Sequence, residues 1–117
     1  MTDIVVLAAR RTAVVPRGGA FRDLEAHDLA APCIRAALTD AGATAADVDD
    51  VIFGNALAAG GNPARLAAAA AGLPERIPAL TIDSQCCGGL DAVALAASRI
   101  AAGAADLLVA GGLERWS

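Results

Sequence analysis

Aromatic side chains are nearly missing from this sequence of 117 residues, which has two phenylalanines, one tryptophan and no tyrosine. Lysine is missing altogether, so arginine supplies all nine basic residues, and the formal net charge is −4. A protein that binds nucleic acid ordinarily presents a basic patch, often with aromatic rings on which bases stack. The composition gives that class of function little support.

Other features that the sequence lacks exclude further classes of protein. The longest apolar stretches are interrupted by Asp83, Asp91 and Asp106, and none is long enough to span a bilayer. The opening Met-Thr-Asp has no basic stretch, so we expect no secretory signal. Three cysteines leave one over after any pairing, which does not make a disulfide framework. These features predict a cytoplasmic protein.

Small apolar side chains are what the sequence has in excess. Hydrophobic residues make up 56% of the chain, and alanine, leucine, valine and isoleucine supply most of them. A chain of this length suits one domain, which buries roughly two-thirds of its extended surface. Small side chains let helices and sheets approach closely, which fits stacked layers. So much apolar content predicts that the chain associates with itself or with a partner.

Strand-like and helix-like runs alternate along the chain. Their hydrophobic spacing and their glycine and proline boundaries predict strands over residues 3–9, 49–57, 78–83 and 105–112, and helices over residues 27–42, 62–74 and 86–102. Residues 10–23, rich in glycine with one proline, are expected to form a loop. This order favours an α/β layer of mainly parallel strands with helical crossovers.

Local signals mark the ends of the helices. Gly42 and Gly103 are natural C-terminal stops, and Asn62 can cap a helix whose first position suits Pro63. Pro32 is tolerable only in the first turn of its helix, because an interior proline removes a hydrogen bond.

The helix predicted over residues 86–102 is apolar nearly all round. We expect its buried stripe to consist of Leu90, Val93, Ala94, Ala97, Ile100 and Ala101. The opposite side is mostly apolar as well, so this helix should be covered on more than one side. The predicted sheet supplies one cover, and a further element must supply the other.

Two adjacent cysteines, Cys86 and Cys87, stand where a strand-like run becomes this helix. Backbone N–H groups at a helix N-terminus stabilise a thiolate by roughly 0.3–1 kcal/mol. That is too little to ionise an ordinary thiol fully at neutral pH, so a second group such as a histidine is needed. The only histidine, His27, precedes the first helix, and nothing in the sequence brings it to Cys86.

The alternative interpretation is that these cysteines are inert packing residues, which is common for cysteine. We expect this role for Cys87, and for Cys33 on a helix face. Gly88 and Gly89 at a helix start carry an entropic cost and need a reason, such as the close approach of a substrate or of another backbone. On these residues alone, a nucleophilic and an inert Cys86 are equally well supported.

Residues 86–117, CCGGLDAVALAASRIAAGAADLLVAGGLERWS, resemble the nucleophile region of thiolases, the acyl-CoA C-acyltransferases. In that family a cysteine is followed by two small residues and Gly-Leu-x-Ala, then by a helix, a strand and Gly-Gly-x-Glu-x-x-Ser. The Gly-Leu-x-Ala run begins here at Gly89. This alignment places the family's nucleophile on Cys86 rather than Cys87.

Two upstream stretches are similar to thiolase motifs in the same order. AARRTAVVPRGGAFRD, residues 8–23, resembles the Ala-x-Arg-Thr-Pro…Gly-Gly-Ala-Leu-x-Asp opening, and VIFGNALAAGGNPARLAAAAAGLP, residues 51–74, resembles the Gly-Asn…Asn-x-x-Arg segment. The resemblance therefore covers essentially the whole chain. It implies a thiolase-like layered α/β fold, of which residues 1–117 are an incomplete N-terminal half with a mainly parallel sheet.

The resemblance also implies an activity in fatty acid metabolism. Cys86 would hold an acyl group as a thioester while a 3-ketoacyl-CoA is cleaved or two acyl-CoAs condense. CoA thioesters would be the substrates, with no metal and no further cofactor. The family's activating histidine and second cysteine lie in its second half, whose motifs this sequence does not contain. We therefore expect the chain to be inactive alone and to need a homo-oligomer or a complementary C-terminal thiolase chain.

Three positions depart from the family pattern. Ala13 replaces the proline after Arg-Thr, Asp91 replaces a frequent lysine, and Cys87 stands where a smaller residue is usual. These departures indicate a different acyl substrate or a relaxed function. A non-catalytic assembly or acyl-CoA-binding module is the main alternative. A relative of the ketoacyl synthases is the weaker one, because the Arg-Thr opening and the Gly-Gly-x-Glu-x-x-Ser close favour a thiolase.

Several polar residues lie in the family-like segments, and structural roles explain them at least as well as functional ones. We expect capping or structural hydrogen bonds from Asn55, Asn62 and Arg65, and a tie to a glycine turn from Glu114. Arginines can contact the phosphates of CoA, but for the loop residues Arg17 and Arg22 a solvated position is the better expectation.

Overall fold

A computed structural model describes residues 3–57 and 60–116 of the chain. Its elements, in chain order, are α1 (Ala26–Ala41), a single 3₁₀ turn (Ala45–Asp47), β1 (Asp50–Gly54), α2 (Pro63–Ala70), β2 (Ala79–Ile82), α3 (Gly88–Ala101) and β3 (Leu108–Gly112). Residues 10–23 form the predicted loop. The three helices and the last three of the four predicted strands are confirmed.

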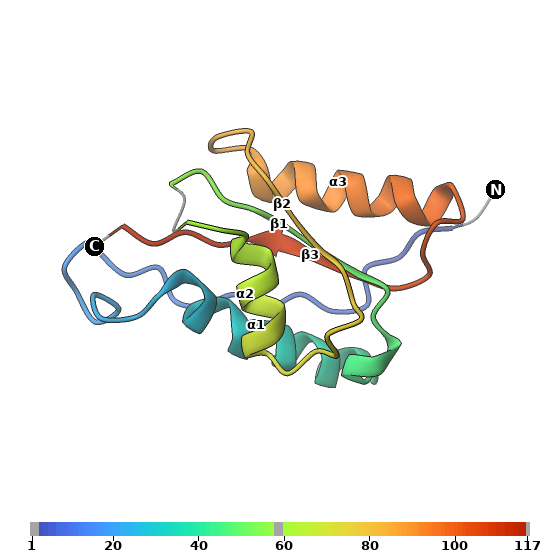
Figure 1. Ribbon diagram of the computed structural model, residues 1–117, viewed down its shortest axis with the longest axis horizontal. Helices are drawn as coiled ribbons and strands as arrows, with labels where there is room; N and C mark the ends of the chain where they lie inside the picture. The colour runs from blue at the N-terminus through green and yellow to red at the C-terminus, as the bar shows by residue number, and fades with distance from the viewer. Residues whose placement is uncertain (1–2, 58–59, 117) are drawn as a thin grey trace.

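The strands form one parallel sheet in the order β2-β1-β3. Ile52 of β1 lies between Leu80 of β2 and Ala110 of β3. The two helices α1 and α2 lie side by side beneath the sheet, and α3 runs above it (Figure 1). The chain is therefore a layered α/β fold, as its sequence predicts.

Both faces of β1 are buried, and its alternating side chains serve two separate cores. Val51 and Phe53 join the alanine-rich faces of α1 and α2, whereas Ile52 packs against Ala92 and Ala96 of α3. Val51 and Ile52 are completely buried. A central parallel strand needs apolar residues on both faces, which explains the unbroken run Val-Ile-Phe.

The helix ends follow the local sequence signals. The chain leaves α1 through Gly42, whose φ of 67° suits glycine. Asn62 caps α2 by accepting a hydrogen bond from the Arg65 N–H (3.2 Å), and Pro63 takes the first helical position. Gly103, also at positive φ, follows α3. Each of these predicted boundaries is confirmed.

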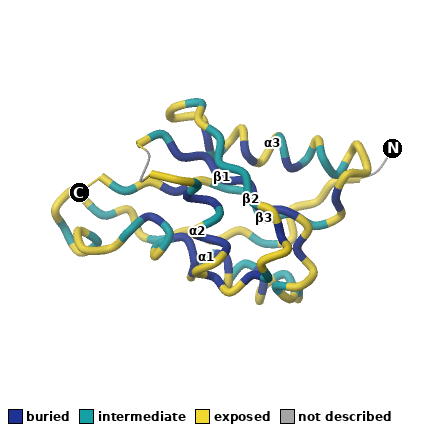
Figure 2. The backbone as a smooth tube through the Cα atoms, viewed as in Figure 1, coloured by how far each residue is buried: buried dark blue, intermediate teal, exposed yellow. Residues whose placement is uncertain are grey.

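The strand predicted over residues 3–9 is wrong. These residues pair with no strand in the described chain, and Val5 and Val6 are 66% and 79% exposed. Figure 2 shows this end of the chain as largely exposed. The composition of the segment suits a strand, but a strand also needs a neighbour. In the described chain the sheet consists of β2, β1 and β3, and residues 3–9 pair with none of them.

The position expected for Pro32 is also wrong, since it lies inside α1 beyond the first turn. Pro32 is exposed, and the buried face of the helix continues past it through Ile34 and Leu38. An interior proline costs about 3 kcal/mol, whereas burying two such side chains gains about 1.5–3 kcal/mol each. The packing of α1 therefore outweighs the lost hydrogen bond.

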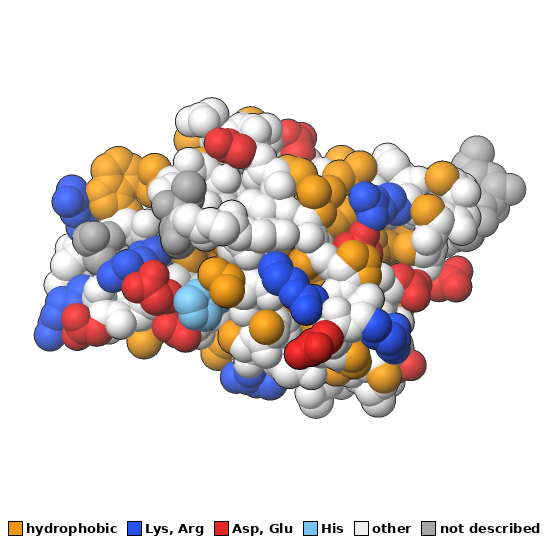
Figure 3. Space-filling view, in the orientation of Figure 1, with side chains coloured by type: hydrophobic (Ala, Val, Ile, Leu, Met, Phe, Trp, Pro, Cys, Tyr) orange, Lys and Arg blue, Asp and Glu red, His pale blue; other side chains and the backbone are white. Residues whose placement is uncertain are grey.

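Four of the six residues expected to form the buried stripe of α3 are exposed instead, whereas Ala97 and Ile100 are half-buried. Leu90 is 73% exposed and Val93 is 45% exposed. The residues that α3 buries are its smallest, Gly88, Ala92 and Ala96. Small side chains occupy this face because they let the helix lie close to the sheet. The space-filling view shows hydrophobic side chains along the outer surface over α3 (Figure 3).

The helices are short relative to a bilayer. None of those formed by residues 3–57 and 60–116 has the length and apolar content that a membrane crossing needs.

Candidate functional site

The candidate site lies at the carboxyl end of the parallel sheet, where ligands commonly bind in α/β folds. The chain leaves β2 at Ile82, makes a tight turn and enters α3 at Gly88. Cys86 and Cys87 are both exposed in this turn. The residue that caps α3 is Cys87, and Cys86 lies one position before it. The helix therefore begins two residues later than expected.

Two backbone hydrogen bonds shape the turn. The Cys87 N–H donates to the Ser84 carbonyl (3.3 Å), and the Gly88 N–H donates to the Gln85 carbonyl (3.2 Å). Gln85 has a φ of +57°. Its N–H donates to the Asp83 Oδ1 (2.9 Å), which closes a side-chain turn typical of aspartate. Cys86 thus follows a residue in the left-handed region.

Glycines set how closely α3 approaches the sheet. A Cβ placed on Gly54, at the end of β1, would lie 2.6 Å from the Cα of Gly88. A Cβ on Gly112, at the end of β3, would lie 3.3 Å from the Cα of Gly89. Backbone meets backbone at both contacts. The close approach of the backbone at Gly54 therefore explains why position 88 is a glycine.

A second group of polar contacts joins α2 to β2. The Asn62 Nδ2 donates to the Ala79 carbonyl (3.0 Å), and the Thr81 hydroxyl donates to the Asn62 Oδ1. The same hydroxyl accepts from the Ala64 N–H (3.0 Å), and Arg65 donates to the Ile77 carbonyl (2.9 Å). Asn62 and Arg65 therefore have the structural roles expected of them.

Asn55 and Glu114 fasten the end of β1 to the chain that follows β3. The buried Asn55 donates through Nδ2 to the Leu113 carbonyl (2.8 Å). The Glu114 carboxylate accepts from the N–H groups of Ala56 and Leu57. Glu114 therefore ties down the loop after β1 rather than only a glycine turn. Both residues order the carboxyl end of the sheet, where the Cys86 turn also lies.

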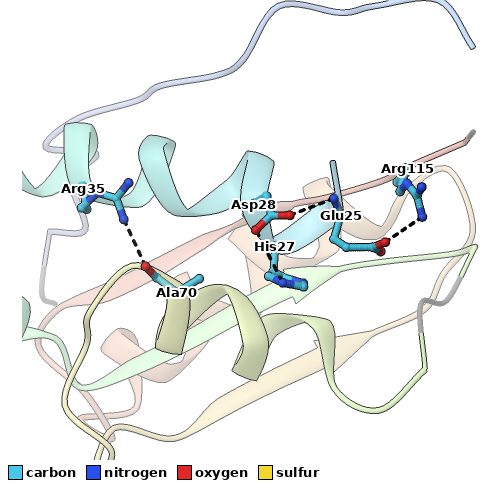
Figure 4. Close-up of polar contacts among 6 residues, drawn as sticks. All are labelled: Glu25, His27, Asp28, Arg35, Ala70 and Arg115. Carbon is cyan, nitrogen blue, oxygen red and sulfur yellow. Dashed lines mark hydrogen bonds and ion pairs between the residues drawn. The ribbon is translucent and has the colours of Figure 1, made fainter. Parts of the chain in front are cut away.

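The single histidine belongs to a different cluster. His27 lies at the start of α1, with Nε2 3.7 Å from a carboxylate oxygen of Asp28. Arg115 donates to Glu25 (3.0 Å) in the same region (Figure 4). Since α1 covers the face of the sheet opposite α3, the described fold does not bring His27 to Cys86. This agrees with the sequence analysis.

Cys33 and the loop arginines lie apart from the Cys86 turn, whereas Cys87 belongs to it. Cys33 is half-buried on α1, and the exposed position of Cys87 contradicts the packing role expected for it. The Arg17 guanidinium lies over the Trp116 ring, 5.8 Å from its centroid. Arg22 and Arg115 border a hollow of about 280 Å³ to which residues 83–90 do not contribute.

Sequence reasoning missed Asp83 and Gln85. The available signal was Asp83 two residues before Gln85, which is the spacing of a known side-chain turn pattern. A positive φ at a glutamine has no comparable sequence signature.

The fold and the site together define a class: a parallel α/β layer with an exposed cysteine at the amino end of a helix packed tightly on the sheet. The family described as "Thiolase, N-terminal domain" matches residues 4–117. The chain therefore belongs to the thiolase family.

Full-length relatives agree with this assignment. The chain is 50% identical to an acetyl-CoA acetyltransferase of Cupriavidus necator and 44% identical to a probable acetyl-CoA acyltransferase of Staphylococcus aureus. All of the chain aligns in both cases, but only 30% of each relative. The crystal structure of the Bacillus anthracis acetyl-CoA acetyltransferase superposes with a TM-score of 0.90 at 36% identity, over 92% of this chain and 28% of that one. The chain thus spans less than a third of these relatives' length.

Proposed function

We propose that this chain is the nucleophile-bearing part of a thiolase-type acyltransferase and that Cys86 carries the acyl group. The observation that supports this most is the exposure of Cys86 immediately before the N-cap of α3, in a chain of the thiolase family. The relatives named as acetyl-CoA acyltransferases suggest acyl-CoA and CoA as the substrates. Cytoplasmic location and a role in fatty acid metabolism remain predictions.

In the cleavage direction, the Cys86 thiolate attacks the 3-keto carbon of a 3-ketoacyl-CoA. The bond between carbons 2 and 3 then breaks, its electron pair leaves on acetyl-CoA as an enolate, and a proton donor completes the product. The thiol of a free CoA attacks the Cys86 thioester and releases the shortened acyl-CoA. Covalent catalysis divides one difficult carbon–carbon cleavage into two easier steps.

The chain's own residues supply only part of this chemistry. Cys86 lies one position before the N-cap of α3, and the backbone N–H groups and positive dipole end of a helix favour a thiolate. The proton transfers need a base, and His27 is engaged on the far side of the sheet. We propose that a histidine and a second cysteine come from the part of the thiolase fold that this chain does not span.

The outward face of α3 supports the need for that further part. Leu90 and Val93 are exposed there, beside the exposed Ala94 and Ala101. A helix that is apolar on both sides belongs in an interior. We propose that a complementary C-terminal thiolase chain or a second copy covers this face.

The test is acyl transfer from a 3-ketoacyl-CoA to CoA, measured for the chain alone and with a candidate C-terminal thiolase chain. The proposal predicts turnover only for the pair and loss of turnover on Cys86→Ala, with Cys33→Ala as the matched control. Absence of turnover from two folded, associated chains contradicts it.

A non-catalytic assembly or acyl-CoA-binding module is the second candidate, favoured by the position of His27 away from Cys86. It predicts that Cys86→Ala leaves CoA-ester binding and assembly unchanged and that no acyl adduct forms on wild-type Cys86.

A further inference from the structure

Gln85 is the one residue other than glycine with a positive φ in the described chain, residues 3–57 and 60–116. Side chains with a Cβ rarely adopt this conformation, because the Cβ crowds the backbone. Where such a residue persists, the surrounding structure must hold it in place, and such positions cluster at functional sites. Here the strained residue immediately precedes Cys86.

The Asp83 side chain holds Gln85 in this conformation. Its Oδ1 accepts from the Gln85 N–H at 2.9 Å and faces the Gln85 side-chain Nε2 at 3.4 Å. The backbone bonds from Cys87 to Ser84 and from Gly88 to Gln85 close the turn on its other side. Both the backbone and the side chain of Gln85 therefore have partners that a different φ would break.

The helix cannot adjust to a change in this turn. Gly54 and Gly88 are in backbone contact, so α3 is fixed against the end of β1. The last residue of β2 is fixed as well, because the Asn55 N–H donates to the Ile82 carbonyl (3.0 Å). Between two fixed ends, the φ of Gln85 is one of the backbone angles that set the direction of the Cys86 side chain.

We propose that Asp83 and Gln85 are positioning residues that direct the Cys86 sulfur toward the amino end of α3. This inference deepens the proposed function and rests on it for its catalytic consequence. Its structural part, the direction of Cys86, is separately measurable through the reactivity of the thiol.

The experiment compares two uncharged variants, one with and one without a hydrogen-bond acceptor. Asp83→Ala and Asp83→Asn both remove the carboxylate charge, but only the asparagine side chain of the second variant keeps an oxygen for the Gln85 N–H. Both are made in the intact chain, with any partner it requires, in a Cys87→Ser background. The rate of Cys86 alkylation by iodoacetamide is followed by peptide mass spectrometry, with Cys33 as the internal reference.

We expect Cys86 alkylation to be about two- to fivefold slower in Asp83→Ala than in Asp83→Asn, because a displaced sulfur loses the helix-end stabilisation of its thiolate. Cys33 should react equally in both. Equal Cys86 rates in the two variants would overturn the inference. Gln85→Gly and Gln85→Ile provide an independent pair: glycine accepts the positive φ, whereas a β-branched side chain does not. Slow alkylation only in Gln85→Ile supports the inference, and equal rates contradict it.

Acyl-adduct formation on Cys86 from acetyl-CoA is measured on the same samples. A loss of adduct in Asp83→Ala that Asp83→Asn restores supports the positioning role in catalysis. If the wild type forms no adduct, the proposed function fails, while the alkylation comparison still decides whether these residues position Cys86.

Discussion

At the scale of single residues, the carboxylate of Asp50 is a buried charge that has two partners. Asp50 is 4% exposed, and its carboxylate accepts from the Val51 N–H (2.8 Å) and pairs with Arg99 from the last turn of α3. A buried charge without its partner is strongly destabilising. This pair therefore fixes the C-terminal end of α3 to the beginning of β1.

Arg99→Ala should lower the free energy of unfolding by about 3 kcal/mol, the lower end for breaking a buried pair, because Arg99 itself is partly exposed. Urea denaturation measures the change. Adding Asp50→Asn to Arg99→Ala should recover part of the loss, since no charge is then left buried. An unchanged denaturation midpoint for Arg99→Ala would show that the pair contributes nothing.

Asp49 makes stability depend on acid. The N–H groups of Asp106 (2.7 Å) and Leu107 (3.1 Å) donate to its carboxylate, and with a smaller effect of Arg76 they hold the Asp49 pKa below its ordinary value of 3.8. A lowered folded-state pKa contributes stability that is fully present above 3.8 and is lost as the pH falls through the folded value.

Asp49→Ala should therefore lower the stability of the fold at pH 6. The variant should also lose less stability than the wild type between pH 4 and pH 2, because this range lies around and below the ordinary pKa of 3.8. Thermal denaturation across that pH series measures both effects. Glu75→Ala, at an exposed residue, serves as the control. A variant with the same acid sensitivity as the wild type would contradict this role of Asp49.

At the scale of elements, the amino end of α3 is fixed by two glycine contacts with the sheet. A Cβ on Gly54 would meet backbone atoms of Gly88, which cannot move independently. A Cβ on Gly89 would meet its nearest neighbour, the Gly112 nitrogen, at an ordinary 3.7 Å. These two glycines therefore predict opposite responses to the same substitution.

Gly54→Ala should destabilise the fold by about 1–3 kcal/mol through overpacking and should also slow acylation of Cys86 by displacing α3. Gly89→Ala should be neutral or stabilise by up to about 1 kcal/mol, because alanine favours a helix. Chemical denaturation and adduct formation measure the two effects. Equal behaviour of both variants would contradict the contact argument.

The same elements show how far the sequence predicts the structure. Caps and glycine stops are local signals, so the ends of α1 and α2 were predictable from Gly42, Asn62 and Pro63. Strand pairing is not local, so residues 3–9 were misassigned. The face of α3 was misassigned because nearly every residue of this helix is apolar, and hydrophobic spacing then identifies no side.

The candidate site was predictable to a similar degree. The cysteine and the glycines beside it marked the turn, and the resemblance singled out Cys86. The left-handed φ of Gln85 was not predictable, because it depends on how the turn joins two fixed elements.

At the scale of the whole molecule, the chain is a thiolase-family layer with one apolar helix face uncovered. Leu90 is 73% exposed on that face, and Leu66 of α2, 42% exposed, lies on a helix that covers the opposite face of the sheet. Apolar surface of this kind promotes association.

Leu90→Glu should therefore weaken self-association or binding of a C-terminal thiolase chain at least tenfold, at roughly 1.4 kcal/mol or more. Leu66→Glu should leave it nearly unchanged. Light scattering after size-exclusion chromatography measures the assembled mass for both. Equal effects from the two substitutions would argue against α3 as the interface.

The central claim is that Cys86 carries the acyl group, and mass spectrometry of the assembled protein after incubation with acetyl-CoA tests it most directly. The account predicts one acetyl group on the peptide containing Cys86, removable by hydroxylamine, present in Cys87→Ser and missing in Cys86→Ser. An unmodified Cys86 that nevertheless reacts with iodoacetamide, or an acetyl group found only on Cys33 or Cys87, would contradict it.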